Sequence, residues 1–254
     1  MKRRRTQKPA DVKPSQDPFP YADYVQAKNN LQTALRGPCF YATLTGNSGM
    51  GKTCLMRDTS AQLDRSRHQI VYLSSSQTSV MGIVRFLAQS LHVAPRRCLP
   101  ETVQSLTQAI GARTAHFLLW IDEADQVPPT TLQEVRMLAE ADPIAAVQTF
   151  SVVLSGLHDL NPHLDTPFLF PLKRRISRRC TLNGLKRNEL DPFIEHRFGT
   201  TDAQRIPHAI RDELFERTQA TPALIDRTVR WALAQTKGAV NEDLIRSILD
   251  TAGL

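Results

Sequence analysis

Two hydrophobic patterns alternate along the chain up to about residue 182. Short apolar runs rich in β-branched and aromatic residues predict buried strands, and apolar positions at helical spacing predict helices between them. The run at 117–121 (FLLWI) is uninterrupted, which is typical of a central parallel strand buried on both faces. The predicted strands are 39–45, 69–74, 117–121 and 148–154, and the predicted helices are 23–36, 54–63, 80–91, 100–113, 130–141 and 159–163.

From Lys186 onward the pattern is helical throughout. Strands that alternate with helices favour a parallel sheet covered by helices. The predicted C-terminal helices are 189–198, 207–218, 222–235 and 241–252. We therefore expect an α/β fold in three parts, namely a disordered basic tail at 1–18, a three-layer parallel-sheet core at 19–182 and a small helical lid domain at 183–254.

Residues 46–53 (GNSGMGKT) fit the pattern G-x-x-x-x-G-K-[ST] at every specified position. A predicted strand precedes them and a predicted helix follows, which is the context that this phosphate-binding loop, or P-loop, requires. Its glycines let the backbone curl so that N–H groups face phosphate oxygens at a helix N-terminus. We expect Lys52 to reach the β- and γ-phosphates and the Thr53 hydroxyl to hold Mg²⁺. The predicted nucleotide-binding residues are Gly46, Asn47, Ser48, Gly49, Met50, Gly51, Lys52, Thr53 and Cys54.

Two acids, Asp122 and Glu123, follow the run at 117–121, where that strand must end. Ligands bind at the carboxyl ends of strands in open α/β sheets, and an apolar strand that ends on two acids is costly unless the acids meet a cation or polarise water. We expect Asp122 to organise Mg²⁺ through water and Glu123 to activate the attacking water. The alternative is an ordinary strand end ahead of a helix. The complete P-loop about 70 residues upstream favours the hydrolysis site.

The strand at 148–154 ends in Ser155-Gly156. In sites of this architecture a polar residue here senses the γ-phosphate, and Ser155 is the best candidate. The alternative is an ordinary turn, since Ser and Gly are frequent in any turn.

The most basic stretch, LKRRISRR at 172–179, holds one lysine and four arginines. The planar fork of arginine suits phosphate clamping because it donates bidentate hydrogen bonds. Three interpretations stay open for this stretch: a finger that reaches the nucleotide of a neighbouring subunit, a contact with the DNA backbone, and a solvated charged face.

The formal net charge of the chain is +7, which favours an anionic binding partner. Nucleic acid is the obvious candidate. The basic tail at 1–18 fits a contact with phosphates or a solvated tail without that role. The four cysteines lie far apart with no C-x-x-C pair, which argues against a zinc site and a disulfide framework. No apolar run approaches a transmembrane helix and the N-terminus lacks the apolar region of a secretory signal, so we expect a cytoplasmic protein that does not bind membranes.

The order of these motifs resembles that of an AAA+ ATPase, which implies a P-loop NTPase core and a helical lid. More narrowly, the chain looks like the ExeA-like branch of bacterial ATPases, which contains the transposition ATPases of the MuB, TniB and TnsC kind. The resemblance covers residues from about 20 to about 250. The narrower match rests on VLSGLHDL at 153–160, LKRRI at 172–176 and ELDPFIEHRF at 189–198.

The resemblance implies that Lys52 and Thr53 bind phosphate and Mg²⁺ and that Asp122 and Glu123 are the acid pair. It also implies that Arg175, which precedes the apolar residue of the arginine segment, is the finger acting across a subunit interface.

Two positions depart from the branch. Leu157 stands where the branch usually has a polar residue, which leaves Ser155 or His158 to sense the phosphate. Leu224 stands where the lid often has an arginine, and Arg227 is the candidate substitute.

The charge and the resemblance together imply an ATP-dependent DNA-binding ATPase that regulates transposition. It would assemble with Mg·ATP as a homo-oligomeric ring or filament on duplex DNA, through backbone contacts, and recruit a transposase to target DNA. A secretion-associated ATPase is one alternative, although we expect the chain to lack room for a membrane span and a wall-binding segment. The other is a nucleotide-dependent interaction switch, against which the intact Glu123 argues.

Overall fold

The computed structural model describes residues 13–74, 79–140 and 148–254. The described residues form two compact units, which divide between Asn183 and Gly184. Asp23–Asn183 makes up the core unit, and Gly184–Leu254 with the described residues up to Ala22 makes up the C-terminal unit. Most of the predicted basic tail, residues 1–12, lies outside the described residues.

Strands alternate with helices through the core unit, as the hydrophobic pattern predicts. The strands are β1 (Tyr41–Gly46), β2 (His68–Leu73), β3 (His116–Ile121), β4 (Ser151–Gly156) and β5 (Ile176–Leu182). The helices are α1 (Ala22–Leu35), α2 (Lys52–Gln62), α3 (Val80–Ser90), α4 (Leu99–Gly111), α5 (Pro129–Ala139), α6 (Leu160–Leu164) and α7 (Phe170–Lys173), with short 3₁₀ turns η1 (Ala124–Gln126) and η2 (Pro167–Leu169).

The strands form one parallel sheet in the order β2-β3-β4-β1-β5. β4 lies between β1 and β3, although it follows both in the chain. The carboxyl ends of β1, β4 and β3 therefore meet at one edge of the sheet, and these are the ends that carry the P-loop, Ser155 and Asp122. The prediction of an α/β parallel-sheet core is confirmed.

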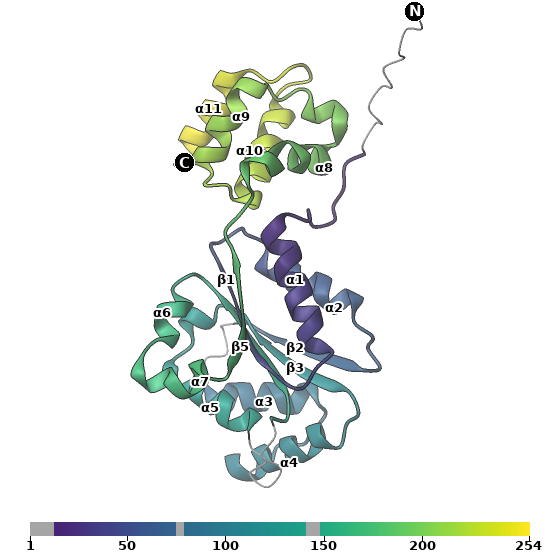
Figure 1. Cartoon of the computed structure of the whole chain (residues 1–254), viewed down its shortest axis with the longest axis vertical. Helices are drawn as coiled ribbons and strands as arrows, with labels where there is room; N and C mark the ends of the chain where they lie inside the picture. Colours follow the sequence, from purple (N-terminus) through teal and green to yellow (C-terminus); the bar gives the residue numbers. More distant parts are fainter. Residues whose placement is uncertain (1–12, 75–78, 141–147) are drawn as a thin grey trace, which may run out of the picture. The chain divides into compact units, whose positions relative to one another are not determined.

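Helices cover both faces of the sheet in three layers (Figure 1). α1 and α2 lie side by side on one face, where Gln32 Nε2 donates to Gln62 Oε1 at 2.9 Å. α3, α4 and α5 pack on the opposite face. Since side chains alternate along a strand, Leu119 and Ile121 of β3 meet α3–α5, and Trp120 between them points to the other face.

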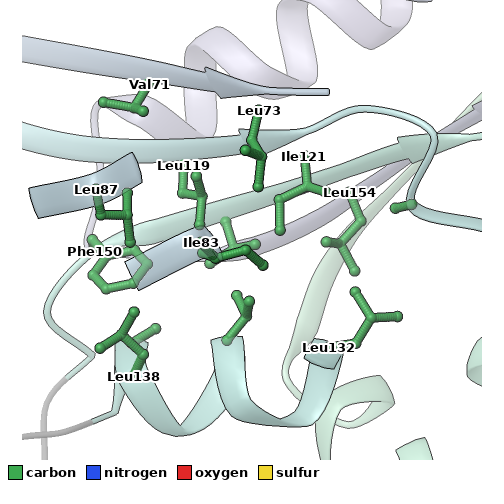
Figure 2. Close-up of a cluster of buried hydrophobic side chains, with 14 of the residues drawn as sticks. Val71, Leu73, Ile83, Leu87, Leu119, Ile121, Leu132, Leu138, Phe150 and Leu154 are labelled. Atoms are coloured by element: carbon green, nitrogen blue, oxygen red, sulfur yellow. The ribbon is translucent and has the colours of Figure 1, made fainter. Parts of the chain in front are cut away.

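Figure 2 shows the apolar cluster that joins the sheet to α3 and α5. Leu119 and Leu154 enter it from the strands, and Leu87 of α3 and Leu132 of α5 enter it from the helices; all four are essentially fully buried. Burying one such side chain contributes about 1.5–3 kcal/mol. The cluster therefore fixes β3 and β4, and with them the positions of the residues that follow these strands.

The hydrophobic pattern does not predict β5, whose sequence ISRRCTL has three exposed polar residues in a row. β5 pairs with β1 alone and forms an edge of the sheet. An edge strand is partly solvated and tolerates charged side chains, which also discourage pairing with other chains. The basic stretch at 172–179 is thus divided between α7 and the first half of β5.

The C-terminal unit is helical, as predicted. Its elements are η3 (Arg187–Glu189), α8 (Leu190–Ala203), η4 (His208–Ile210), α9 (Arg211–Arg217), α10 (Pro222–Gln235) and α11 (Glu242–Thr251). Gly199 interrupts α8 with a φ of 79°, a conformation that favours glycine. Arg211 is buried, and its Nη atoms pair with Asp191 at 2.9 Å and donate to two backbone carbonyls, whereas its buried Nε has no hydrogen-bond partner among the described residues.

The described part of the predicted tail, residues 13–18, is hydrogen-bonded to α8 through Ser15. Ser15 N donates to the His196 carbonyl at 2.8 Å, and Arg197 Nη1 donates to the Ser15 carbonyl at 3.1 Å.

Among the described helices, none combines the length and the apolar character needed to cross a bilayer.

Gly156, the last residue of β4, has a role in packing that can be tested. A β-carbon there would lie 2.2 Å from Asp125 Oδ1, and that carboxylate is held in place because Leu157 N donates to it at 2.9 Å. We expect Gly156→Ala to lower the free energy of unfolding by about 1–3 kcal/mol, the usual cost of overpacking. Urea denaturation measures this change.

Gly111→Ala is the matched control. Gly111 ends α4, and no described atom lies within 4 Å of an added β-carbon there apart from its chain neighbours and the backbone of its own helix. We expect this substitution to leave the stability unchanged or to raise it by about 0.4–1 kcal/mol, because alanine restricts the unfolded chain. Equal losses in the two variants would show that the Asp125 contact does not require glycine.

Candidate functional site

The P-loop joins β1 to α2 by a tight turn that two glycines make possible. Gly49 and Gly51 have φ values of 83° and 97°, in the left-handed region where residues with a β-carbon are strained. α2 begins at Lys52, two residues earlier than the predicted helix, and no side chain of the described residues caps its N-terminus. The first N–H groups of such a helix have no partner within the helix, so they are suited to bind an anion.

Gly46 is required for a different reason. A β-carbon on Gly46 would lie 2.7 Å from the backbone carbonyl oxygen of Leu182, the last residue of β5. The backbone of β5 therefore forms a wall beside the first residue of the P-loop.

Lys52 lies across the P-loop. Its Nζ donates to the carbonyl oxygens of Gly46 at 2.6 Å and Asn47 at 3.1 Å. Burial lowers the pKa of Lys52, while the nearby carboxylates of Asp122, Asp125 and Glu123 oppose that shift. The acids that follow β3 therefore lie close enough to the P-loop lysine to affect its pKa.

Thr53 and Asp122 form the direct link between the two predicted motifs. Thr53 Oγ1 donates to Asp122 Oδ2 at 3.2 Å across 69 positions of sequence. Asp122 is only 7% exposed, so its charge depends on such donors. The structure therefore brings the end of β3 and the start of α2 together at one point.

Ser155 lies beside Asp122 and is fully buried. Its Oγ donates to Asp122 Oδ1 at 2.7 Å and accepts from Trp120 Nε1 at 2.8 Å. Its contacts with the protein therefore orient the acid. A direct role for Ser155, or for His158 three residues later, in sensing the γ-phosphate stays a prediction.

Tyr72 is a site residue that the sequence analysis missed. Its hydroxyl donates to Asp122 Oδ2 at 2.6 Å from the neighbouring strand β2. Burial and the hydrogen bond to Asp122 raise the pKa of Tyr72 to about 12, so the phenol keeps its proton near neutral pH. The sequence shows a tyrosine near the end of the predicted strand at 69–74. Which residue its hydroxyl contacts depends on the order of the strands in the sheet.

Glu123 follows Asp122 with a left-handed backbone, φ 51° and ψ 39°, which is uncommon for a residue with a side chain. This turn lets Glu123 N donate to Asp122 Oδ1 at 3.1 Å and leaves the Glu123 residue exposed at the sheet edge. Asp125, which the sequence analysis also missed, fixes the next loop by accepting from Leu157 N.

Arg175 is not part of this cluster. β1 and β5 are parallel, and Tyr41 pairs with Ile176 at one end while Gly46 pairs with Leu182 at the other. Arg175 therefore lies near the amino end of β1, about 16 Å from the P-loop at a rise of about 3.3 Å per residue. It forms an ion pair with Glu140, with Nε 2.9 Å from Oε1.

The remaining predicted residues have less defined surroundings. Cys54 is exposed on the first turn of α2, and Asn47 and Ser48 are exposed in the P-loop. Arg227 is exposed on α10 of the C-terminal unit, and its contact with a nucleotide stays a prediction.

The polar groups around Asp122 and the P-loop fit a nucleotide with bound magnesium better than a metal ion held by protein side chains alone. No group of three His, Cys, Asp or Glu side chains in the described part of the chain could hold a metal ion. The site offers instead a hydroxyl, a carboxylate and an uncapped helix N-terminus. Magnesium is usually bound through one or two carboxylates together with substrate phosphates, which these groups match.

Comparison with known proteins agrees with this geometry. Residues 39–164 match the family model described as an AAA domain. The chain is 25% identical over 179 residues to general secretion pathway protein A of Aeromonas hydrophila, covering 68% of this chain and 32% of that protein. It is 27% identical over 221 residues to ATP-dependent target DNA activator B of Escherichia phage Mu, covering 81% of this chain and 64% of that protein.

The chain thus spans less than two thirds of the length of either relative. Among solved structures, the fold is similar to that of the Aeropyrum pernix ORC1 protein in complex with DNA, with a TM-score of 0.63 at 16% identity over 93% of this chain and 66% of that one. The family model and the two relatives confirm the predicted resemblance to the AAA+ ATPases, the solved structure agrees with the fold, and residues 39–164 of this chain belong to the AAA domain family.

Proposed function

We propose that this protein is an ATPase that uses Mg·ATP to assemble on DNA and to regulate transposition. The observation that carries the ATPase part is the contact of Thr53 with Asp122, which joins the P-loop to the acid pair. A P-loop alone binds a nucleotide, whereas hydrolysis also needs groups that organise the metal and the attacking water.

Each residue of the cluster has a role in this proposal. The N–H groups of the P-loop and the Lys52 amine bind the phosphates. Thr53 and Asp122 would hold Mg²⁺, and the bound ion would neutralise the charge that develops on the phosphate oxygens. Glu123 accepts a proton from the attacking water, and its exposure at the sheet edge leaves its carboxylate within reach of solvent.

Glu123→Gln separates binding from hydrolysis. The substitution keeps the size of the side chain and removes the base, so we expect phosphate release to fall about 100-fold or more while ATP affinity stays close to wild type. Single-turnover phosphate release and ATP titration measure the two properties. Lys52→Ala is the control and should lose ATP binding itself. A wild-type protein that released phosphate no faster than Glu123→Gln would favour the interaction switch over the ATPase.

The position of Arg175 supports a role toward a second subunit. It lies at the end of β1 opposite to the P-loop, so it does not approach the nucleotide bound by its own chain. Its side chain is more than half exposed and pairs with Glu140 at 2.9 Å. We propose that it reaches the nucleotide of a neighbouring copy in a homo-oligomer, where an arginine stabilises the transition state.

Arg175→Ala tests the finger, and Glu140→Gln is its matched control. If Arg175 acts on the transition state, its loss should lower the turnover of the assembled protein about 1,000-fold or more, with ATP affinity changed by less than about threefold. Glu140→Gln breaks the same ion pair but leaves the arginine in place, so turnover should stay near wild type. Equal effects of the two substitutions on turnover would assign the ion pair a structural role only.

The role in transposition is proposed from the similarity to the phage Mu protein, which is named as an ATP-dependent activator of target DNA. This match covers more of both chains than the match to the secretion protein does. The net charge of +7 supports the same choice, because a basic surface favours a polyanionic partner. A secretion-associated role is the alternative, and recovery of the protein with the inner membrane on fractionation would favour it.

The contacts within the basic stretch indicate which of its residues are available for DNA. Lys173 pairs with Asp165 at 2.6 Å, Arg174 lies over the Phe170 ring and Arg175 pairs with Glu140. Arg178 and Arg179 are exposed on β5 and form no ion pair with a described residue. We propose these two arginines as contacts with the DNA backbone.

An Arg178→Ala/Arg179→Ala double variant tests this surface. In gel shifts with a non-hydrolysable ATP analogue, we expect wild type to bind duplex DNA and the variant to bind more weakly. The slope of log affinity against log salt should fall by about 2, since each lost phosphate contact removes about one unit.

An Arg65→Ala/Arg67→Ala double variant changes the same charge on two exposed arginines between α2 and β2. Its affinity and slope should stay near wild type. Equal losses in both double variants would indicate a general charge effect, and no DNA binding by wild type would contradict the proposed DNA partner.

A further inference from the structure

The carboxylate of Asp122 is held at both oxygens. Oδ2 accepts from Tyr72 Oη at 2.6 Å and from Thr53 Oγ1 at 3.2 Å. Oδ1 accepts from Ser155 Oγ at 2.7 Å and from Glu123 N at 3.1 Å. Bonds to an ionised acceptor are stronger than bonds between neutral groups, so these donors restrict the carboxylate more than packing alone would.

Such restriction matters because the last torsion of an aspartate is broad. The terminal sp³–sp² torsion has no sharp staggered minima, so the rotamer does not fix the plane of the carboxylate. A group that holds Mg²⁺, directly or through water, must present its oxygens within narrow limits, because magnesium demands near-ideal octahedral geometry. The hydrogen bonds to Asp122 must therefore set that plane.

Tyr72 differs from the other donors in its origin. Thr53 and Glu123 belong to the predicted motifs, and Ser155 is itself held by Trp120 Nε1 at 2.8 Å. Tyr72 comes from β2, the strand on the far side of β3, and makes the shortest of the contacts to Asp122. Its side chain therefore approaches the carboxylate from the side opposite to Ser155 of β4.

We propose that Tyr72 is a positioning residue of the metal site, which fixes Oδ2 of Asp122 while Ser155 and Trp120 fix Oδ1. The inference rests on the proposed function of Asp122. Tyr72 touches neither phosphate nor metal in this proposal and acts through Asp122, to which Thr53, the other side chain that hydrogen-bonds the Tyr72 hydroxyl, also donates. Its loss should weaken the contribution of Mg²⁺ to nucleotide binding and leave metal-free binding by the P-loop unchanged.

The test uses Tyr72→Phe in the full chain, which removes the hydroxyl and keeps the ring. A fluorescent ATP analogue is titrated in EDTA and then at increasing Mg²⁺, so that no turnover is needed. We expect the affinity in EDTA to stay within about twofold of wild type and the Mg²⁺ concentration for half-maximal effect to rise about tenfold, which corresponds to about 1.4 kcal/mol.

Two further variants make the test specific. Tyr41→Phe is the matched control, because it removes a phenol hydroxyl at the opposite end of the sheet, where Oη donates to the Arg136 carbonyl at 3.4 Å. It should leave the Mg²⁺ dependence unchanged. In an Asp122→Asn background, Tyr72→Phe should cause no additional shift, because two residues that act through one contact are not additive.

The proposal is overturned if Tyr72→Phe keeps the wild-type Mg²⁺ dependence, or if its shift persists in full in the Asp122→Asn background. An equal loss of affinity in EDTA would assign Tyr72 a general structural role and would also overturn it. Failure of the proposed function gives a different result, since wild type would then bind no nucleotide or Asp122→Asn would not change the Mg²⁺ dependence.

Discussion

The hydrogen bonds to the Asp122 carboxylate are the constraint on which the site depends. They connect α2, β2, β3 and β4 at one point, through Thr53, Tyr72 and Ser155. A carboxylate that is 7% exposed is tolerated because these donors replace the water it has lost. The apolar cluster beneath holds the strand ends in register, and the carboxylate in turn holds together the loops that follow those strands.

Most of the fold and the two motifs could be predicted from the sequence, because they depend on local patterns. The P-loop is contiguous, and the buried run at 117–121 predicts a central strand whose carboxyl end carries the two acids. β5 and Tyr72 could not be predicted in the same way. The edge position of β5 removes the hydrophobic signal, and the partner of Tyr72 depends on strand order, which no local pattern encodes.

The basic stretch shows how structure divides a run of like charges. One strong composition signal supports three interpretations, and the structure gives the side chains of this stretch different neighbours. Glu140 and Asp165 pair with Arg175 and Lys173, whereas Arg178 and Arg179 on the edge strand form no ion pair with a described residue. Charge in a sequence therefore indicates an anionic partner in general, and the local acids decide which residues can contact it.

The close approach of Leu182 to Gly46 has a structural consequence. Asn183, the next residue, is the last of the core unit, and both its backbone N and its side-chain Nδ2 are pinned to Asp23 at 3.0 Å. The backbone that leads out of this unit is therefore the same backbone that borders the nucleotide loop. The segment that connects the two units and the first residue of the P-loop thus share one stretch of backbone pairing, since Gly46 pairs with Leu182 in the sheet.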